Sequence, residues 1–331
     1  MKVCKPLVLG TALFAASISA ASMSMEAFAA DYTLRLGSVL APTDPLQIAA
    51  EGMKKSVEER SKGAIEVQLF PNSQLGDTQD MMDQAAAGAN VGTFVEASRV
   101  SVFVPEFNVL VAPYAFDSVD ELARFVETDT FDGWNRQLKE KSGLTLLSFN
   151  WYQGARHLLT KKPVSGPADL KGVRVRTIGQ PLWVETIGAM GAVATPLPWA
   201  EVYPSLQTGV IDGAEAQPSA IWGAKLYEVV TDITLTGHIH LMSGLLVSDA
   251  WLQSLPEDLR AIVSEEAKRW GGQALKANVD GAEKIFADVR ATGVNVTRID
   301  VMAFKGAVKP VWDKMELTDL VAQVRTELKN Q

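Results

Sequence analysis

Two arginines at the ends of apolar segments are the residues of this chain best suited to binding chemistry. Arg156 and Arg176 each lie at or near the point where an apolar stretch stops. A guanidinium in such a place is costly to desolvate unless it meets an anion. Its rigid fork of donors matches a carboxylate better than the ammonium of a lysine does. The two arginines therefore predict a pocket that captures the carboxylate of a small ligand.

A salt bridge between domains would explain the same arginines without a ligand. Glu96, Asp212 and Glu215 are the acidic residues that such a bridge would use. A buried ion pair satisfies the charges of both partners. The residues alone leave ligand capture and the salt bridge as open alternatives.

Tryptophans gather around the same part of the chain, at positions 151, 183, 199 and 222. Most tryptophans in such a set belong to a hydrophobic core, although ligand pockets also have aromatic walls with few polar groups. Trp199 stands beside a proline-rich bend and is our candidate for such a wall, and Trp151 is a second candidate.

Signatures of catalysis and of metal binding are absent from the sequence, which has no phosphate loop, nucleophile elbow or zinc-protease motif. His238 and His240 would share one side of a strand, but zinc sites need three or four ligands. A secreted hydrolase or isomerase using Glu96, Asp77 or Glu215 as acid and base is the competing enzyme hypothesis. We expect no enzymatic activity, no metal and no cofactor.

The first residues have the composition of an export signal. Lys2 and Lys5 precede an apolar run, and residues 27–29 (AFA) have the small residues of a cleavage site. We expect residues 1–29 to be a signal peptide that is removed, and the mature protein to be periplasmic. Cys4 is the only cysteine, so the mature chain would contain no disulfide.

The charge balance excludes one class of partner. The chain has 31 basic and 39 acidic residues, a net charge of −8, and removal of the expected leader makes it −9. Nucleic-acid binding needs a basic surface, so we expect no nucleic-acid partner.

Alternating strand and helix patterns position the candidate residues. Residues 32–37 and 65–70 have the alternation of strands, with an amphipathic helix over 45–62 between them. A further strand over 91–95 delivers Glu96 at its end. This β-α-β order is typical of an α/β domain with a parallel sheet.

A second domain is predicted to begin near residue 154. Residues 173–176 and 210–215 have the pattern of strands, with a helix over 181–191 between them. The apolar stretch 238–247 is long enough to connect both domains.

The longest periodic pattern is a helix from Leu255 to about Thr292. Ser254 and Glu257 have the spacing of a capping box at its start, and Gly271–Gly272 would soften it. At about 1.5 Å per residue, such a helix exceeds one small domain, so we expect it to brace two.

Together, the motifs resemble the solute-binding proteins of tripartite ATP-independent periplasmic (TRAP) transporters. The stretches that carry the resemblance are FPNSQLGD, FVEASR, LKGVRVRT, ATPLPWAEVYPSLQTGVIDGAE and SLPEDLR. The resemblance implies an α/β clamshell of two lobes braced by the long helix. We expect lobe I to comprise residues 30–153 and 242–281, and lobe II residues 154–241 and 282–331.

The resemblance also implies a binding cleft and its occupants. It places the carboxylate anchor at Arg176 and adds further cleft residues at positions that match the family's motifs, namely Arg156, Glu96, Trp199, Gln74, Asp77 and Glu215. Gly179 and Ala216 stand where sialic-acid binders have asparagines, which argues against that ligand. The partners implied are a small organic acid and the membrane subunits of a permease, with a sensor as the alternative recipient, and we expect a monomer.

Overall fold

The computed structural model of the chain describes residues 1–3 and 30–330. The expected leader at residues 1–29 therefore lies almost wholly outside the described residues. Among the described residues, no helix combines the length and the apolar composition needed to cross a membrane.

Lobe I is built on a five-stranded sheet with the order β2-β1-β3-β10-β4. Its strands are β1 (Tyr32–Gly37), β2 (Ile65–Phe70), β3 (Val91–Glu96), β4 (Leu144–Ala155) and β10 (His240–Ser248). The first three strands pair in parallel, as the β-α-β pattern predicted, and β10 inserts antiparallel between β3 and β4. Its helices are α1 (Pro45–Arg60), α2 (Thr78–Ala86), α3 (Ala97–Val100), η1 (Pro105–Val111), α4 (Val119–Phe125), α5 (Asp129–Ser142) and α9 (Asp249–Ser254).

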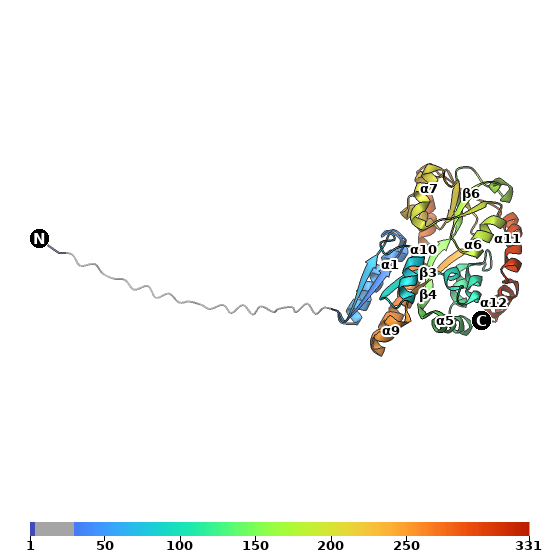
Figure 1. Cartoon of the computed structure of the whole chain (residues 1–331). Helices are drawn as coiled ribbons and strands as arrows, with labels where there is room; N and C mark the ends of the chain where they lie inside the picture. The colour runs from blue at the N-terminus through green and yellow to red at the C-terminus, as the bar shows by residue number, and fades with distance from the viewer. Residues whose placement is uncertain (4–29, 331) are drawn as a thin grey trace.

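Lobe II has a six-stranded sheet with the order β11-β9-β5-β8-β6-β7. Its strands are β5 (His157–Thr160), β6 (Arg174–Thr177), β7 (Val193–Pro196), β8 (Gly213–Ala216), β9 (Asp232–Leu235) and β11 (Asn295–Arg298). Short helices connect them, namely η2 (Pro167–Leu170), α6 (Pro181–Ala189), η3 (Trp199–Glu201), α7 (Val202–Thr208), α8 (Pro218–Gly223) and η4 (Leu226–Glu228). In Figure 1, α7 and β6 lie in the upper lobe, and α5 and α9 lie in the lower one.

The chain passes between the lobes at several places. The first crossing runs from β4 to β5 through Arg156, and the second returns from β9 to β10. The two crossing segments are hydrogen-bonded to each other, because Arg156 N donates to Ile239 O at 2.8 Å. The stretch from residue 238 onward therefore connects the two sheets, as predicted.

The long helix α10 (Glu257–Ala291) makes a third connection. It packs on α1 and β4 of lobe I and continues to β11 of lobe II, so it braces both lobes as expected. Its predicted capping box is wrong: Pro256 is the N-cap, and Ser254 ends α9, where its hydroxyl donates to Trp251 O. A proline ring can occupy that position because the amides at a helix start need no intrahelical acceptor.

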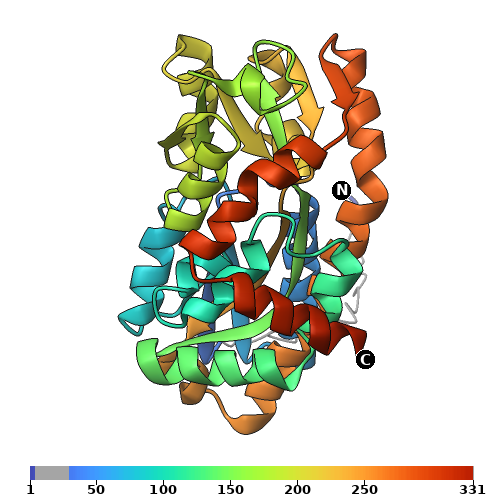
Figure 2. The ribbon, with the colours of Figure 1, turned by 90° about the vertical axis from the view of Figure 1, so that its right-hand side faces the viewer.

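The C-terminal helices depart from the expected lobe boundaries. Helix α11 (Met302–Lys314) packs on α6, whereas α12 (Thr318–Lys329) packs on α4 and η1. Arg325 fixes α12 there by donating to Tyr114 O and Ala115 O, both at 3.1 Å. Figure 2 shows α11 descending from the upper lobe and α12 lying over the lower one. Residues 318–329 thus lie on lobe I rather than on lobe II.

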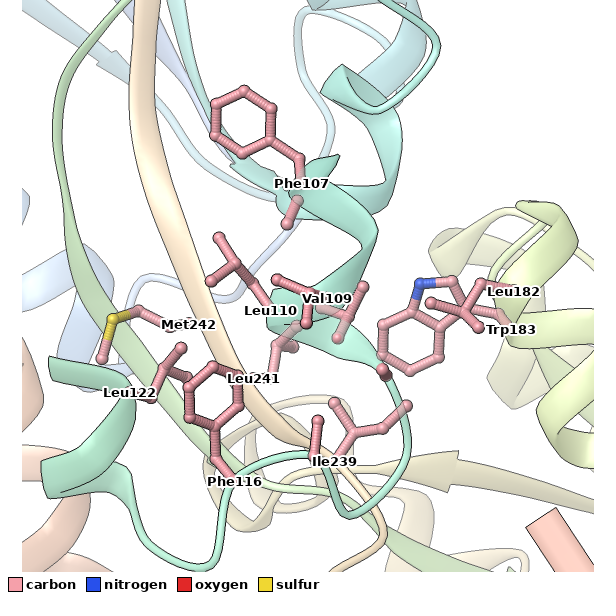
Figure 3. Packing of buried hydrophobic residues seen from close by; sticks show 14 of the residues in the cluster. Phe107, Val109, Leu110, Phe116, Leu122, Leu182, Trp183, Ile239, Leu241 and Met242 are labelled. Carbon is pink, nitrogen blue, oxygen red and sulfur yellow. The ribbon is translucent and has the colours of Figure 1, made fainter. Parts of the chain in front are cut away.

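One hydrophobic cluster extends across both lobes. Trp183 and Leu182 of α6 face Val109 and its neighbours in η1 (Figure 3). Trp183 is fully buried, and its Nε1 donates to Ser98 Oγ of α3 at 2.8 Å. The two lobes are therefore in direct contact beside the crossing strands.

Candidate ligand-binding site

A cavity of about 350 Å³ lies between the lobes. Lobe I contributes the end of β3, the start of α2 and Gln153, and lobe II contributes the ends of β6 and β7 together with Gln217. Ligand pockets typically enclose roughly 300–1,000 Å³, so this cavity suits a small molecule. Five of the residues expected in the site line it, namely Arg176, Arg156, Glu96, Trp199 and Asp77.

Arg176 is a buried cation that is held by a backbone carbonyl. It lies in β6, which pairs with β7 and β8, and only 4% of its surface is exposed. Its Nε and Nη2 donate to Leu197 O at 2.9 and 2.7 Å. Among the described residues, no carboxylate lies within 4.0 Å of its guanidinium. Burial lowers the pKa of Arg176 to about 10, against the smaller opposing effects of the charges of Glu215 and Glu96.

Trp199 forms the wall against which Arg176 lies. The guanidinium carbon stands 5.4 Å from the centroid of the indole ring, within the range of a cation–π contact. The stacking and the two bonds to Leu197 hold the guanidinium in one orientation. Trp199 lines the cavity, as the sequence suggested.

Arg156 is held differently, because its charge is already neutralised. It forms an ion pair with Glu215, and it also donates to Glu215 O at 2.5 Å and to Gln217 Oε1 at 2.7 Å. Glu215 is fully buried behind the cavity and accepts a further bond from Thr177 Oγ1. The salt-bridge alternative therefore describes Arg156, with both partners in lobe II and not across the lobes.

Arg174 does not take part in the site. It is exposed at the start of β6 and pairs with Asp212 at 2.8 Å. This pair lowers the pKa of Asp212 to about 2, mainly through the hydrogen bond from Arg174. Of the two arginines that alternate along β6, only Arg176 faces the cavity.

Glu96 and Arg99 form a charged pair on the lobe I side. Glu96 ends β3 and Arg99 follows one helical turn later in α3, with Oε1 and Nε 2.7 Å apart. Neither atom forms a well-directed hydrogen bond with any residue that the structure describes, so the contact is ionic with poor geometry. The sequence analysis did not identify Arg99, although the i, i+3 spacing from Glu96 on a helix could have indicated it.

A chain of amide side chains crosses the floor of the cavity. Arg156 donates to Gln217, whose Nε2 donates to Gln153 Oε1 at 2.8 Å, and Gln153 Nε2 donates to Ser243 Oγ at 2.6 Å. Arginine can only donate, so it fixes the orientation of both amides. Gln153 and Gln217 were not predicted, because only the pairing of β5 with β8 brings these positions together.

The remaining predicted residues occupy three different environments. Asp77 caps α2, where Oδ1 accepts from Gln79 N at 2.7 Å and Asp80 N at 3.0 Å, and it borders the cavity. Gln74 is exposed and does not line the cavity. Trp151 is fully buried, and its ring centroid lies 4.8 Å from that of Phe94, a lining residue, so Trp151 supports the cavity wall from behind.

The histidines lie at the crossing strands, outside the cavity. His238 contacts Thr236 Oγ1 through Nδ1 at 2.8 Å, and His157 Nδ1 accepts from Gly237 N at 3.0 Å. Burial lowers the pKa of both imidazoles, so both are neutral near pH 7. Within the described part of the chain, no cluster of three or more His, Cys, Asp or Glu side chains is arranged to hold a metal ion.

The sequence of this chain is similar to those of one known protein family. The model of bacterial extracellular solute-binding protein family 7 matches residues 36–319. The 2,3-diketo-L-gulonate-binding periplasmic protein of Escherichia coli is 32% identical over 90% of either chain.

Two solved structures of TRAP periplasmic solute-binding proteins are also similar. An apo open structure from Escherichia fergusonii is 43% identical, with a TM-score of 0.79 over 89% of this chain and 99% of the other. A structure from Actinobacillus succinogenes with bound L-galactonate is 30% identical, with a TM-score of 0.86 over 90% of this chain and 100% of the other. Members of this family are substrate-binding components of transport systems, not enzymes. The chain belongs to bacterial extracellular solute-binding protein family 7, the family of TRAP transporter solute-binding proteins.

Proposed function

We propose that the cleft captures a small organic acid by its carboxylate, with Arg176 as the anchor. The observation that carries this proposal is the contrast between the cavity's arginines. Arg156 and Arg99 each have a carboxylate partner, whereas no carboxylate in residues 30–330 pairs with Arg176. A ligand carboxylate bound there forms charge-assisted hydrogen bonds with a cation that has already lost its water.

The surroundings of Arg176 suit a carboxylate ligand. Leu197 O and Trp199 fix the guanidinium, so little side-chain freedom is lost when the ligand binds. The start of α6 also lines the cavity at Gln180, where no side chain caps the helix. The acids that name or occupy the similar proteins, 2,3-diketo-L-gulonate and L-galactonate, support an acid as the ligand of this chain.

Binding is proposed to stabilise closure of the lobes. Residues of both lobes line the cavity, so a ligand contacts both only when they are close together. This chain overlaps better with the L-galactonate-bound structure at 30% identity than with the open structure at 43%. Sequence similarity alone favours the reverse order, so we infer that the lobes here are arranged closer to the bound form.

The recipient of the ligand is proposed to be a membrane permease of the TRAP type. In this role the protein is exported by a cleaved signal peptide, acts as a monomer in the periplasm and delivers the acid to the permease. A sensor is the alternative recipient. Genes for small and large permease subunits beside this gene would favour transport, and a sensor-kinase gene in their place would favour the alternative.

Substitution of Arg176 tests the anchor. Thermal-shift screening against organic acids identifies a ligand, and calorimetry then compares wild type with Arg176→Ala. Loss of one partner from a buried charge pair costs about 2–5 kcal/mol, so affinity falls at least about 30-fold. Arg174→Ala, on the same strand, removes an equal charge and leaves affinity unchanged. Equal affinity of Arg176→Ala and wild type would rule out the anchor.

A further inference from the structure

The charges that line the cleft are nearly balanced before any ligand binds. Arg99 is paired with Glu96, and Arg156 is paired with Glu215 behind the lining. Asp77 borders the cavity with a carboxylate engaged in helix capping. Arg176 is thus the single lining cation that lacks an anionic partner among the described residues.

We propose that the cleft selects hydroxylated acids with a single carboxylate, and that Glu96 is the residue that excludes a second one. The proposal rests on the proposed capture of an acid by Arg176. One carboxylate neutralises Arg176, and the described lining then offers no further unpaired cation for another. A second carboxylate would be desolvated between the lobes without a counter-charge, and such a charge is strongly disfavoured.

Glu96 is placed to impose this discrimination. Its side chain lines the cavity but exposes only 9% of its surface, with Oε1 shielded from solvent against Arg99 Nε. It also lies near enough to Arg176 to act on that residue's pKa. A ligand hydroxyl can donate to the carboxylate of Glu96 where this side chain borders the cavity, whereas a ligand carboxylate is only repelled by it. Specificity through an unfavourable contact with the wrong ligand is a common device in proteins.

Other polar groups in the lining suit hydroxyls. Thr78, Gln79, Gln153 and Gln180 offer neutral donors and acceptors around the cavity. Neutral groups of this kind bond well to alcohols and supply no charge for a second carboxylate.

Arg99 is the side chain that argues for the opposite selectivity. It contacts Glu96 through Nε, and its Nη1 lies 3.5 Å from Gln79 Oε1. A second ligand carboxylate at the remaining donors of Arg99 would share this one cation with the buried carboxylate of Glu96, which combines incomplete charge compensation with repulsion. The pair therefore disfavours dianions as long as Glu96 is ionised.

Matched pairs of acids test the proposal directly. Aldonic and aldaric acids of one configuration differ only at the terminal carbon, which is an alcohol in the first and a carboxylate in the second. Calorimetry at neutral pH compares gluconate with glucarate, galactonate with galactarate, and mannonate with mannarate. For each pair in which binding is detected, we expect the monocarboxylate to bind at least about tenfold more tightly than the dicarboxylate, which corresponds to about 1.4 kcal/mol.

Two variants should change the ratio of the monocarboxylate affinity to the dicarboxylate affinity in opposite directions. Glu96→Gln removes the negative charge and leaves Arg99 unpaired, so the preference for the monocarboxylate falls at least about tenfold. Arg99→Gln leaves Glu96 unpaired, so the preference increases. Glu257→Gln, at the exposed start of α10 and outside the lining, changes the net charge equally and leaves the ratio unchanged. A merely structural role of Glu96 would weaken both acids alike.

The possible results distinguish a failure of the monocarboxylate preference from a failure of acid capture by Arg176. Equal or tighter binding of the dicarboxylate by wild type overturns the inference and leaves acid capture standing. An unchanged ratio in a folded Glu96→Gln variant also overturns it. If Glu96→Gln does not fold, an unchanged or reduced ratio in Arg99→Gln overturns it. Binding of none of the six acids overturns both the inference and its proposed substrate class.

Discussion

At the scale of single residues, two arginines of similar burial have different roles because their neighbours differ. Arg156 and Arg176 expose 3% and 4% of their surface. Glu215 neutralises the first, while the second contacts the carbonyl of Leu197 and the face of Trp199 and no carboxylate in the described part of the chain. A buried charge with dipoles but no counter-ion is the place where an anionic ligand gains most.

Asp44 is a second buried charge whose environment has a measurable consequence. It caps α1, with Oδ1 accepting from Leu46 N at 2.9 Å. Its Oδ2 has no formed hydrogen bond among the described residues, although Ser219 of α8 in lobe II is close enough to act on its pKa. Burial raises the pKa of Asp44 from 3.8 to about 6, against the smaller opposing effects of these neighbours.

Asp44→Asn should therefore stabilise the protein at neutral pH. A folded-state pKa above the unfolded value means that stability is full below 3.8 and is lost as pH rises through about 6. Asparagine remains a good N-cap and cannot ionise, so the variant avoids a loss of up to about 3 kcal/mol. Urea unfolding near pH 7 should show a higher free energy of unfolding for the variant than for wild type. Near pH 4 this difference should be smaller, because Asp44 of the wild type is then largely protonated in the folded state. A gain of equal size at both pH values would contradict the assignment.

At the scale of elements, the two adjacent glycines of α10 have different environments. A Cβ on Gly271 would stand 2.0 Å from Asn150 Oδ1 and 3.0 Å from Trp151 Nε1 of β4, whereas a Cβ on Gly272 would meet nothing within 4 Å. The helix runs unbroken through both residues. Gly271 thus permits close packing of α10 on the lobe I sheet, and the softening expected at this pair is not seen.

Alanine at each position should shift stability in opposite directions. Gly271→Ala forces the buried Trp151 or Asn150 to move, at a cost of about 1–3 kcal/mol. Gly272→Ala should stabilise the helix by about 0.5–1 kcal/mol, because glycine is a poor helix former. Urea unfolding of both variants provides a matched comparison. Destabilisation by Gly272→Ala of the same size as by Gly271→Ala would show that crowding against β4 is not the cause.

At the scale of the whole molecule, the lobes are joined by more than their crossing strands. Helix α10 braces one side, and α11 with α12 joins α6 of lobe II to α4 and η1 of lobe I. Trp183 adds a buried contact by bonding to Ser98 and stacking on Arg156, with the guanidinium carbon 5.1 Å from its ring. The binding site and the contact between the lobes therefore share Arg156, and we expect occupancy of the site to be coupled to closure.

The processing of the N-terminus and the oligomeric state can be predicted for the whole molecule. Protein expressed in a Gram-negative host should be recovered from the periplasm with an intact mass that begins at Ala30 or Asp31, and it should scatter light as a monomer. Ala29→Arg places a large charge at the small-residue site and should block removal of the leader. Recovery of the full-length mass for wild type from the periplasm would contradict cleavage, and a dimer mass would contradict the monomer.

The sequence by itself determined the features that depend on local pattern. Alternation placed β1, β2 and β3, periodicity placed α1 and α10, and the motif around Arg176 indicated the family and the candidate anchor. It predicted strands over 173–176 and 210–215, where β6 and β8 lie, but not the equally short β7, β9 and β11. Four residues carry little alternation, so strands of this length are not consistently distinguished from loops.

Only the tertiary structure decided which charges are paired and which polar groups meet. The pairing of β5 with β8 brings Glu215 and Gln217 to Arg156, and the meeting of the lobes places Glu96 and Arg99 opposite Arg176. Trp151 and Trp199 have the same residue type, yet one is core and the other lines the cavity. Charge compensation and burial depend on residues distant in the chain, so local sequence cannot specify them.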